Sequence, residues 1–197
     1  VSFDNPDGPK VLEGKNKNYN FNKINFLFEA IKKTKNITDK PLIGFAGGPW
    51  TALTYSILNS TERKDPLKHI KEKEKIIDKE IKDLTQLTIE YAFKQIDAGI
   101  DIFQLFESSA GMLNDEQLIK WCIEPCKEIF KNIKKYKKIP TIAFPRGVSL
   151  DNYITYSNIE DLNCLSLDQF FNLKNINKLN ANKTLQGNLN PETLKKG

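Results

Sequence analysis

Short, mostly apolar runs alternate with longer amphipathic stretches along most of this chain of 197 residues. Runs of this length, bounded by turn residues, predict buried strands. They lie at residues 42–45, 100–106, 141–144, 164–167 and 184–186. Each strand is followed by a segment that predicts a helix, so we expect a parallel sheet with right-handed crossover connections. This alternation leaves two architectures open, a closed barrel and a doubly wound open sheet.

Apolar side chains three or four residues apart predict the helices between these strands. They are expected at residues 21–33, from Trp50 onward, at 65–98, 115–136, 157–162 and 170–179, and from Pro191 onward. Asn114, with Gln117 three residues later, predicts a capping box. Pro125 should kink the helix that follows or mark its restart. Asn190 is expected to cap the last helix, in which Pro191 holds the first position.

The amino-acid composition argues against a nucleic-acid partner, a membrane partner and a disulfide-linked fold. The net charge is +5, the basic residues are almost all lysine, and the only arginines are Arg63 and Arg146. Basic residues do not cluster with aromatic ones, so we expect no nucleic-acid partner. No apolar run has the length of a membrane span, so no membrane partner is expected either. The three cysteines form no disulfide framework, which favours reduced thiols and a cytoplasmic location.

The two ends of the sequence lead us to expect a piece of a longer protein. The chain begins at Val1, has one methionine, Met112, and ends at Gly197, just after an apparent helix start. No linker divides it. We therefore interpret residues 1–197 as a single domain that is an internal piece of a longer protein.

Several candidate catalytic features fail on inspection. The glycine turn at residues 44–49 lacks the lysine and hydroxyl of a phosphate loop. Ser108 has no evident base, because the only histidine, His69, lies in a lysine-rich helical stretch. Cys122 and Cys126 share a helix face but lack partners for a metal site, so they are expected to be small buried residues.

Two charged residues follow predicted strands. Arg146 comes just after residues 141–144, and its planar guanidinium matches carboxylates. A surface salt bridge would explain it equally well. Asp168 closes the run 164–167 and is expected either to cap the next helix or to face a site.

Three segments carry a family resemblance. They are Pro41-Leu42-Ile43-Gly44-Phe45-Ala46-Gly47-Gly48-Pro49-Trp50-Thr51-Ala52-Leu53-Thr54-Tyr55, Leu105-Phe106-Glu107-Ser108-Ser109-Ala110-Gly111 and Leu185-Gln186-Gly187-Asn188-Leu189-Asn190-Pro191. In this order and spacing the chain resembles the uroporphyrinogen decarboxylase family. The resemblance implies a (β/α)8 TIM barrel, of which about five β/α units are present here. It also implies a homodimer that removes the four acetate carboxyls of uroporphyrinogen III, giving coproporphyrinogen III, with no metal or organic cofactor.

The resemblance also assigns site residues. Phe45 and Phe106 match aromatic residues that pack on the substrate macrocycle. Tyr55 matches a tyrosine that hydrogen-bonds at the reacting acetate, and Ser108 matches a serine that contacts a substrate carboxylate. Arg146 is our candidate for binding another carboxylate. The expected cleft joins all five residues at the carboxyl ends of barrel strands.

Some family features are not in this chain. The arginine-rich Arg-Gln-Ala-Gly-Arg motif, the aspartate that binds the pyrrole NH groups and a late histidine would all lie outside it, so the chain alone is expected to be inactive. Asn190 stands where the family has aspartate. Two alternatives remain. One is a corrinoid-dependent zinc methyltransferase of the same superfamily, although Phe144-Pro145-Arg146 replaces its His-x-Cys pair. The other is a non-catalytic tetrapyrrole-binding barrel.

Overall fold

The computed structural model describes residues 20–57 and 74–196. Its centre is one parallel sheet in which every strand pairs with the next along the chain. The strands are β1 (Ile43–Gly47), β2 (Ile102–Glu107), β3 (Thr141–Pro145), β4 (Cys164–Ser166) and β5 (Thr184–Gln186). All five predicted strands are therefore confirmed, with no end more than two residues from its predicted position.

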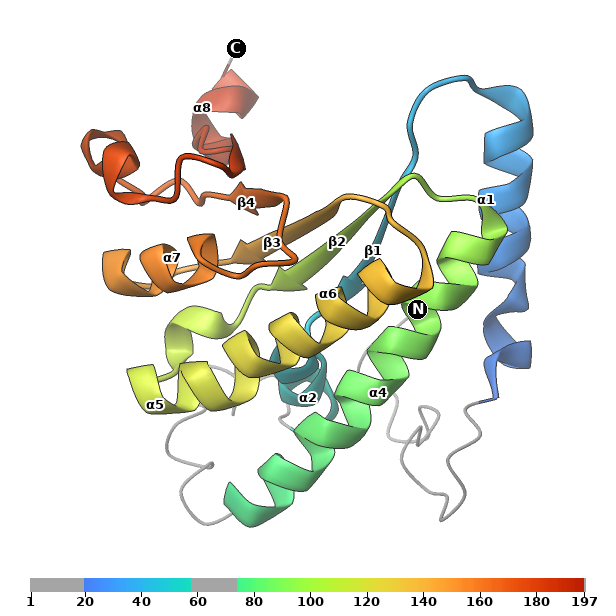
Figure 1. The fold of residues 1–197 in the computed structure, drawn as a ribbon, viewed down its shortest axis with the longest axis horizontal. Helices are drawn as coiled ribbons and strands as arrows, with labels where there is room; N and C mark the ends of the chain where they lie inside the picture. The colour runs from blue at the N-terminus through green and yellow to red at the C-terminus, as the bar shows by residue number, and fades with distance from the viewer. Residues whose placement is uncertain (1–19, 58–73, 197) are drawn as a thin grey trace.

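The strand order distinguishes the two architectures that the alternation left open. A doubly wound sheet reverses its strand order at a switch point and carries helices on both faces. Here the order is β1-β2-β3-β4-β5 without reversal. Figure 1 shows the strands side by side, with α4 and α6 lying together against the sheet. This progression is that of a barrel wall.

Helices connect the strands. They are α1 (Asn25–Ile37), α2 (Pro49–Ile57), α4 (Glu74–Ala98), α5 (Asp115–Leu118), α6 (Glu124–Tyr136), α7 (Leu150–Ser157) and α8 (Pro191–Lys196). Shorter 3-10 turns cover Phe21–Ile24, Ala110–Met112 and Leu173–Lys178, and a π-helical turn covers Ile119–Ile123. None of the helices in the described part of the chain is long and apolar enough to cross a membrane.

The two faces of the sheet differ in what covers them. On β1, Gly44 and Ala46 are buried under the helices, whereas Ile43 and Phe45 on the opposite face are exposed. The covered face holds the core, in which the indole rings of Trp50 and Trp121 stack with centroids 5.4 Å apart. In a barrel, the uncovered face is the interior, and we call it the inner face below.

Two of the predicted helix signals are confirmed. Asn114 accepts the Gln117 backbone N–H, and the Gln117 side chain accepts the Asn114 backbone N–H, which completes the capping box. Pro125 lies in the first turn of α6, directly after the π-helical turn. Proline cannot donate a backbone hydrogen bond, so the helix restarts at this point.

The helix predicted at residues 157–162 is wrong. The real helix, α7, begins at Leu150, where Ser149 caps its N-terminus by accepting the Asn152 backbone N–H, and it ends at Ser157, where the prediction begins. The weak segment at 170–179 forms only the 3-10 turn Leu173–Lys178. Asn190 caps α8 through the backbone N–H of Glu192, as predicted. The first part of the helix predicted at 65–98 lies outside the described residues.

Candidate functional site

Three aromatic rings form a row across the inner face at the carboxyl ends of β1, β2 and β3. The rings of Phe45 and Phe106 meet edge to face with centroids 5.8 Å apart, and those of Phe106 and Phe144 do so at 5.9 Å. The register explains the row, since Phe106 pairs with Gly47 on one side and Phe144 on the other. Phe45 is 61% exposed, so the row is open to solvent.

Phe45 and Phe106 were predicted from the sequence as site residues, whereas Phe144 was not. The signal was available, because Phe144 lies two residues before Arg146 on a predicted strand. Recognising it needed the register of β2 against β3, which places it beside Phe106.

The turn after β1 leads into helix α2, which holds Tyr55. Gly48 donates its backbone N–H to the Phe106 carbonyl oxygen at 2.8 Å, which ties the turn to β2. A Cβ at Gly48 would collide with the Glu107 carboxyl, so only glycine fits there. Helix α2 begins at Pro49 and carries Tyr55 in its last turn, where the side chain is 56% exposed.

Ser108 follows β2 and is half-buried. Its neighbour Ser109 lies against α2, where the Ser109 and Thr54 hydroxyl oxygens are 3.4 Å apart. Thr54 directly precedes Tyr55. The structure therefore brings together the segments that hold the two predicted hydroxyl groups, Tyr55 and Ser108.

Arg146 extends the site to the end of β3. Its backbone N–H donates to the Glu107 carbonyl oxygen at 3.2 Å, and its carbonyl oxygen accepts the Gly111 N–H at 2.9 Å. The side chain is exposed. Within the described part of the chain, no carboxylate lies within ion-pair distance of its guanidinium group. Among residues 20–57 and 74–196, Arg146 therefore has no partner for the surface salt bridge that was its alternative explanation.

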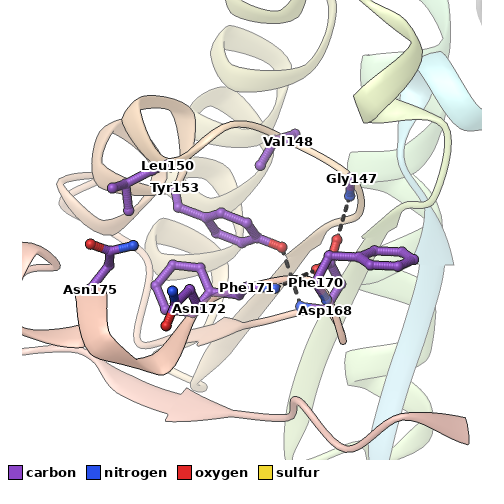
Figure 2. Close-up of a pocket in the computed structure, with 9 residues that line it drawn as sticks. All are labelled: Gly147, Val148, Leu150, Tyr153, Asp168, Phe170, Phe171, Asn172 and Asn175. Carbon is purple, nitrogen blue, oxygen red and sulfur yellow. Dashed lines mark hydrogen bonds between the residues drawn. The ribbon is translucent and has the colours of Figure 1, made fainter.

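Asp168 organises the ends of β3 and β4. The carboxylate is 6% exposed and accepts backbone N–H groups from Gly147 at 2.6 Å, Phe170 at 2.8 Å and Phe171 at 3.1 Å. Asp168 does not cap the next helical turn, because Asn172 caps Leu173–Lys178; the Asp168 carboxylate instead joins the loops that follow β3 and β4. Figure 2 shows it beside a pocket of about 360 Å³, where the Tyr153 hydroxyl accepts the Asp168 N–H.

Glu107 is a second residue of this region that was not predicted from the sequence as a site residue. Its side chain points to the helix-covered face and is 2% exposed. Burial raises the pKa of its carboxyl to about 7, although hydrogen bonds from Thr51 lower it in part. The sequence contained a signal for Glu107, because it is a charged residue directly after the predicted strand at 100–106 and directly before Ser108.

The cysteines behave as predicted. Cys122 and Cys126 are fully buried, and burial raises the pKa of both thiols well above the ordinary value. They are therefore neutral packing residues. Among the described residues, no cluster of three or more His, Cys, Asp and Glu side chains could hold a metal ion. His69 and Arg63 lie outside the described residues.

Comparisons with known proteins bear on this site. The sequence profile of the uroporphyrinogen decarboxylase (URO-D) family matches residues 3–197. A uroporphyrinogen decarboxylase from Orientia tsutsugamushi (strain Boryong) is 38% identical over 194 residues, which cover 94% of this chain and 56% of that protein. One from Rickettsia rickettsii (strain Sheila Smith) is 33% identical, over 91% of this chain and 52% of that protein. The chain spans about half the length of the curated relatives it matches.

Two solved structures share the fold. A methyltransferase from Methanosarcina mazei superposes with a TM-score of 0.69 at 19% identity, covering 85% of this chain and 49% of its own. A B12-independent methionine synthase from Shewanella sp. W3-18-1 does so with a TM-score of 0.51 at 15% identity, covering 72% and 42%. The five β/α units are therefore part of a (β/α)8 barrel. The profile match over residues 3–197 and the 38% identity to the Orientia tsutsugamushi protein show that the chain belongs to the uroporphyrinogen decarboxylase family.

Proposed function

We propose that the protein containing this chain decarboxylates the four acetate side chains of uroporphyrinogen III to give coproporphyrinogen III, a step of porphyrin biosynthesis. The observation that carries the proposal is the open aromatic row Phe45–Phe106–Phe144 at the carboxyl ends of β1 to β3. Family membership supports the same reaction. The proposal concerns the whole protein, since the chain spans about half the length of its relatives.

The chemistry of the substrate fits this arrangement. Uroporphyrinogen has an apolar tetrapyrrole body and a rim of carboxylates. The aromatic row offers apolar surface to the pyrrole rings, and aromatic faces attract positive charge. In this proposal, Tyr55 and Ser108 supply hydroxyl donors to the carboxylate rim, and Arg146 supplies a guanidinium group for a carboxylate. Carboxyl ends of barrel strands are where such sites are assembled.

The reaction needs a proton and an electron sink. A proton added to a pyrrole carbon makes the ring cationic. The bond between the acetate methylene and its carboxyl carbon then breaks, its electron pair moves into the ring, and carbon dioxide leaves. A second proton on the methylene carbon gives the methyl product, and loss of the ring proton restores the pyrrole. Protein groups accelerate these steps by stabilising the ring cation more than the neutral substrate.

The test uses the full-length protein that contains this chain. Anaerobic incubation with uroporphyrinogen III should release carbon dioxide and form coproporphyrinogen III, measured by chromatography after oxidation to the porphyrins. Absence of product from folded full-length protein would contradict the proposal. Zinc content measured on the same sample separates the alternative, because tight stoichiometric zinc would favour the methyltransferase reading. Tetrapyrrole binding without turnover would favour the non-catalytic barrel.

The same resemblance supports a cytoplasmic homodimer as the state of the full-length protein. Light scattering coupled to size-exclusion chromatography would measure its mass. A monomer that retains turnover would contradict the dimer as a requirement for activity.

A further inference from the structure

The Glu107 carboxyl lies behind the site, on the helix-covered face of β2. Its Oε2 atom accepts hydrogen bonds from the Thr51 backbone N–H at 3.1 Å and from the Thr51 hydroxyl at 2.7 Å. Thr51 is in the first turn of α2, where backbone N–H groups lack partners within the helix. Glu107 therefore acts as the N-terminal cap of a helix that it does not belong to.

Thr51 also contacts the loop after β2, and so links that loop to the Glu107 carboxyl. The Thr51 hydroxyl oxygen accepts the Ser109 backbone N–H at 3.2 Å. The Trp50 indole N–H donates to the Ser109 carbonyl oxygen at 3.1 Å, on the same side of the loop. The residues before and after Ser108 are thus both held to α2, Glu107 by its side chain and Ser109 by its backbone.

The backbone of Glu107 holds the third part of the site. Its carbonyl oxygen accepts the Arg146 backbone N–H at 3.2 Å. One residue therefore joins three segments, namely α2 with Tyr55, the loop with Ser108 and the end of β3 with Arg146. No other connection among these segments uses a buried carboxyl group in the described part of the chain.

The placement is hard to explain as a contribution to packing alone. The second carboxyl oxygen of Glu107, Oε1, is buried and has no hydrogen-bond partner among the described residues. An unpartnered buried polar atom destabilises a fold. The groups that face the carboxyl from the neighbouring helices are Cys122, Cys126 and Tyr156, and burial raises the pKa of each well above its ordinary value, so all three are neutral. Among residues 20–57 and 74–196, no lysine or arginine forms an ion pair with Glu107.

We propose that Glu107 is a positioning residue for the decarboxylation: through Thr51 it fixes α2 against the β2 loop, and so sets where the Tyr55 hydroxyl lies relative to Ser108. The inference rests on the proposed function and adds a residue that does not touch substrate. Substrate affinity comes mainly from the aromatic row and the carboxylate contacts. A small displacement of α2 should therefore affect the chemical step more than binding.

The experiment compares four variants of the full-length protein in the coproporphyrinogen assay. Glu107→Leu and Thr51→Val remove one side of the Glu107–Thr51 contact, and each should lower kcat about tenfold or more while KM changes less than about threefold. Glu107→Gln keeps an acceptor for Thr51 and should restore kcat to within about threefold of wild type. Thr85→Val is the matched control, because its hydroxyl is equally buried but donates only within α4, to the Ile81 carbonyl.

The outcomes separate the two proposals. If the wild-type protein turns over and kcat is unchanged in both Glu107→Leu and Thr51→Val, this inference is overturned and the proposed function stands. Equal losses in Thr51→Val and Thr85→Val would also overturn it, because the effect would then be general destabilisation. No turnover by folded wild-type protein would overturn the proposed function and the inference together. If Glu107→Leu does not fold, Thr51→Val and Glu107→Gln still decide the question.

Discussion

Phe106 and Glu107 are consecutive residues on β2 whose side chains point to opposite faces of the sheet. The Phe106 ring lies on the inner face between the rings of Phe45 and Phe144. The Glu107 carboxyl lies on the helix-covered face and accepts two hydrogen bonds from Thr51. The end of one strand therefore supplies both a wall of the candidate site and the anchor for the helix that carries Tyr55.

Replacing Phe106 with leucine should weaken substrate binding. Phe106 is the central ring of the row, and each edge-to-face pair that it makes is worth about 0.5–1.5 kcal/mol beyond simple burial. We expect Kd for uroporphyrinogen, or for the less labile uroporphyrin, to rise about tenfold, measured by fluorescence titration. Phe170→Leu is the control, because Phe170 is an exposed phenylalanine outside the row. Equal Kd values for both variants would show that the row does not bind the tetrapyrrole.

Tyr55→Phe should lower the rate more than it weakens binding. The change removes only the hydroxyl, so the loss reports an interaction that strengthens in the transition state. We expect kcat to fall at least roughly tenfold. Steady-state kinetics on each successive acetate would measure it, with Tyr136→Phe as control, because that hydroxyl donates to Asp97 on the helical surface. Unchanged turnover on every acetate would refute a catalytic role for Tyr55.

Arg146→Ala should weaken binding more than Arg63→Ala does. Arg146 is at the end of β3 beside the Ser108 loop, whereas Arg63 lies outside the described residues, in a polar stretch of sequence. A rise in KM of about tenfold is expected for Arg146→Ala, with partial rescue by Arg146→Lys, which keeps the charge but loses the two-pronged geometry. Negligible effects of both alanine changes would remove Arg146 from the site.

The pKa of Glu107 predicts how the stability of the full-length protein changes with pH. Because the folded pKa is about 7 and the ordinary value is 4.5, the folded state holds the proton more tightly. The stability that the folded protein gains by holding this Glu107 proton is present in full below about pH 4.5 and is lost as the pH rises through 7. Its upper limit is about 3 kcal/mol, since one pKa unit corresponds to about 1.4 kcal/mol.

Glu107→Gln should abolish that dependence. Urea unfolding between pH 5 and 8 should show the wild-type free energy of unfolding falling relative to that of Glu107→Gln, with Glu192→Gln, an exposed carboxylate on α8, as control. Parallel curves for wild type and Glu107→Gln would mean that the carboxyl does not titrate in this range.

The 197-residue chain by itself should not turn over uroporphyrinogen. The sheet has five strands within residues 20–57 and 74–196, and Ile43 and Phe45 on its inner face are exposed, so substrate would meet an open wall instead of a closed site. Coproporphyrinogen formation by the purified chain, compared with a full-length relative, would measure this. Comparable rates would contradict both the incomplete barrel and the roles assigned to the site residues.

The sequence by itself determined the strands and most of the helix ends. Each strand is a short apolar run bounded by turn residues, and Asn114 and Asn190 cap helices through neighbours in the chain. The motifs around Phe45, Ser108 and Leu185 also carried the family resemblance, because they depend only on residue order. Weak local signals gave a wrong prediction at residues 157–162. The helix in this part of the chain is α7, which begins after the Ser149 cap and ends at Ser157.

Only the tertiary structure decided which residues meet. The strand order separated a barrel wall from a doubly wound sheet, and the register of β2 against β3 put Phe144 beside Phe106. Asp168 became a loop anchor only once Gly147 lay within reach of its carboxylate. Glu107 became the anchor of α2 for the same reason, since Thr51 is 56 residues away along the chain. Such contacts join residues that no local pattern links, so their energies depend on the folded arrangement and not on the order of the residues nearby.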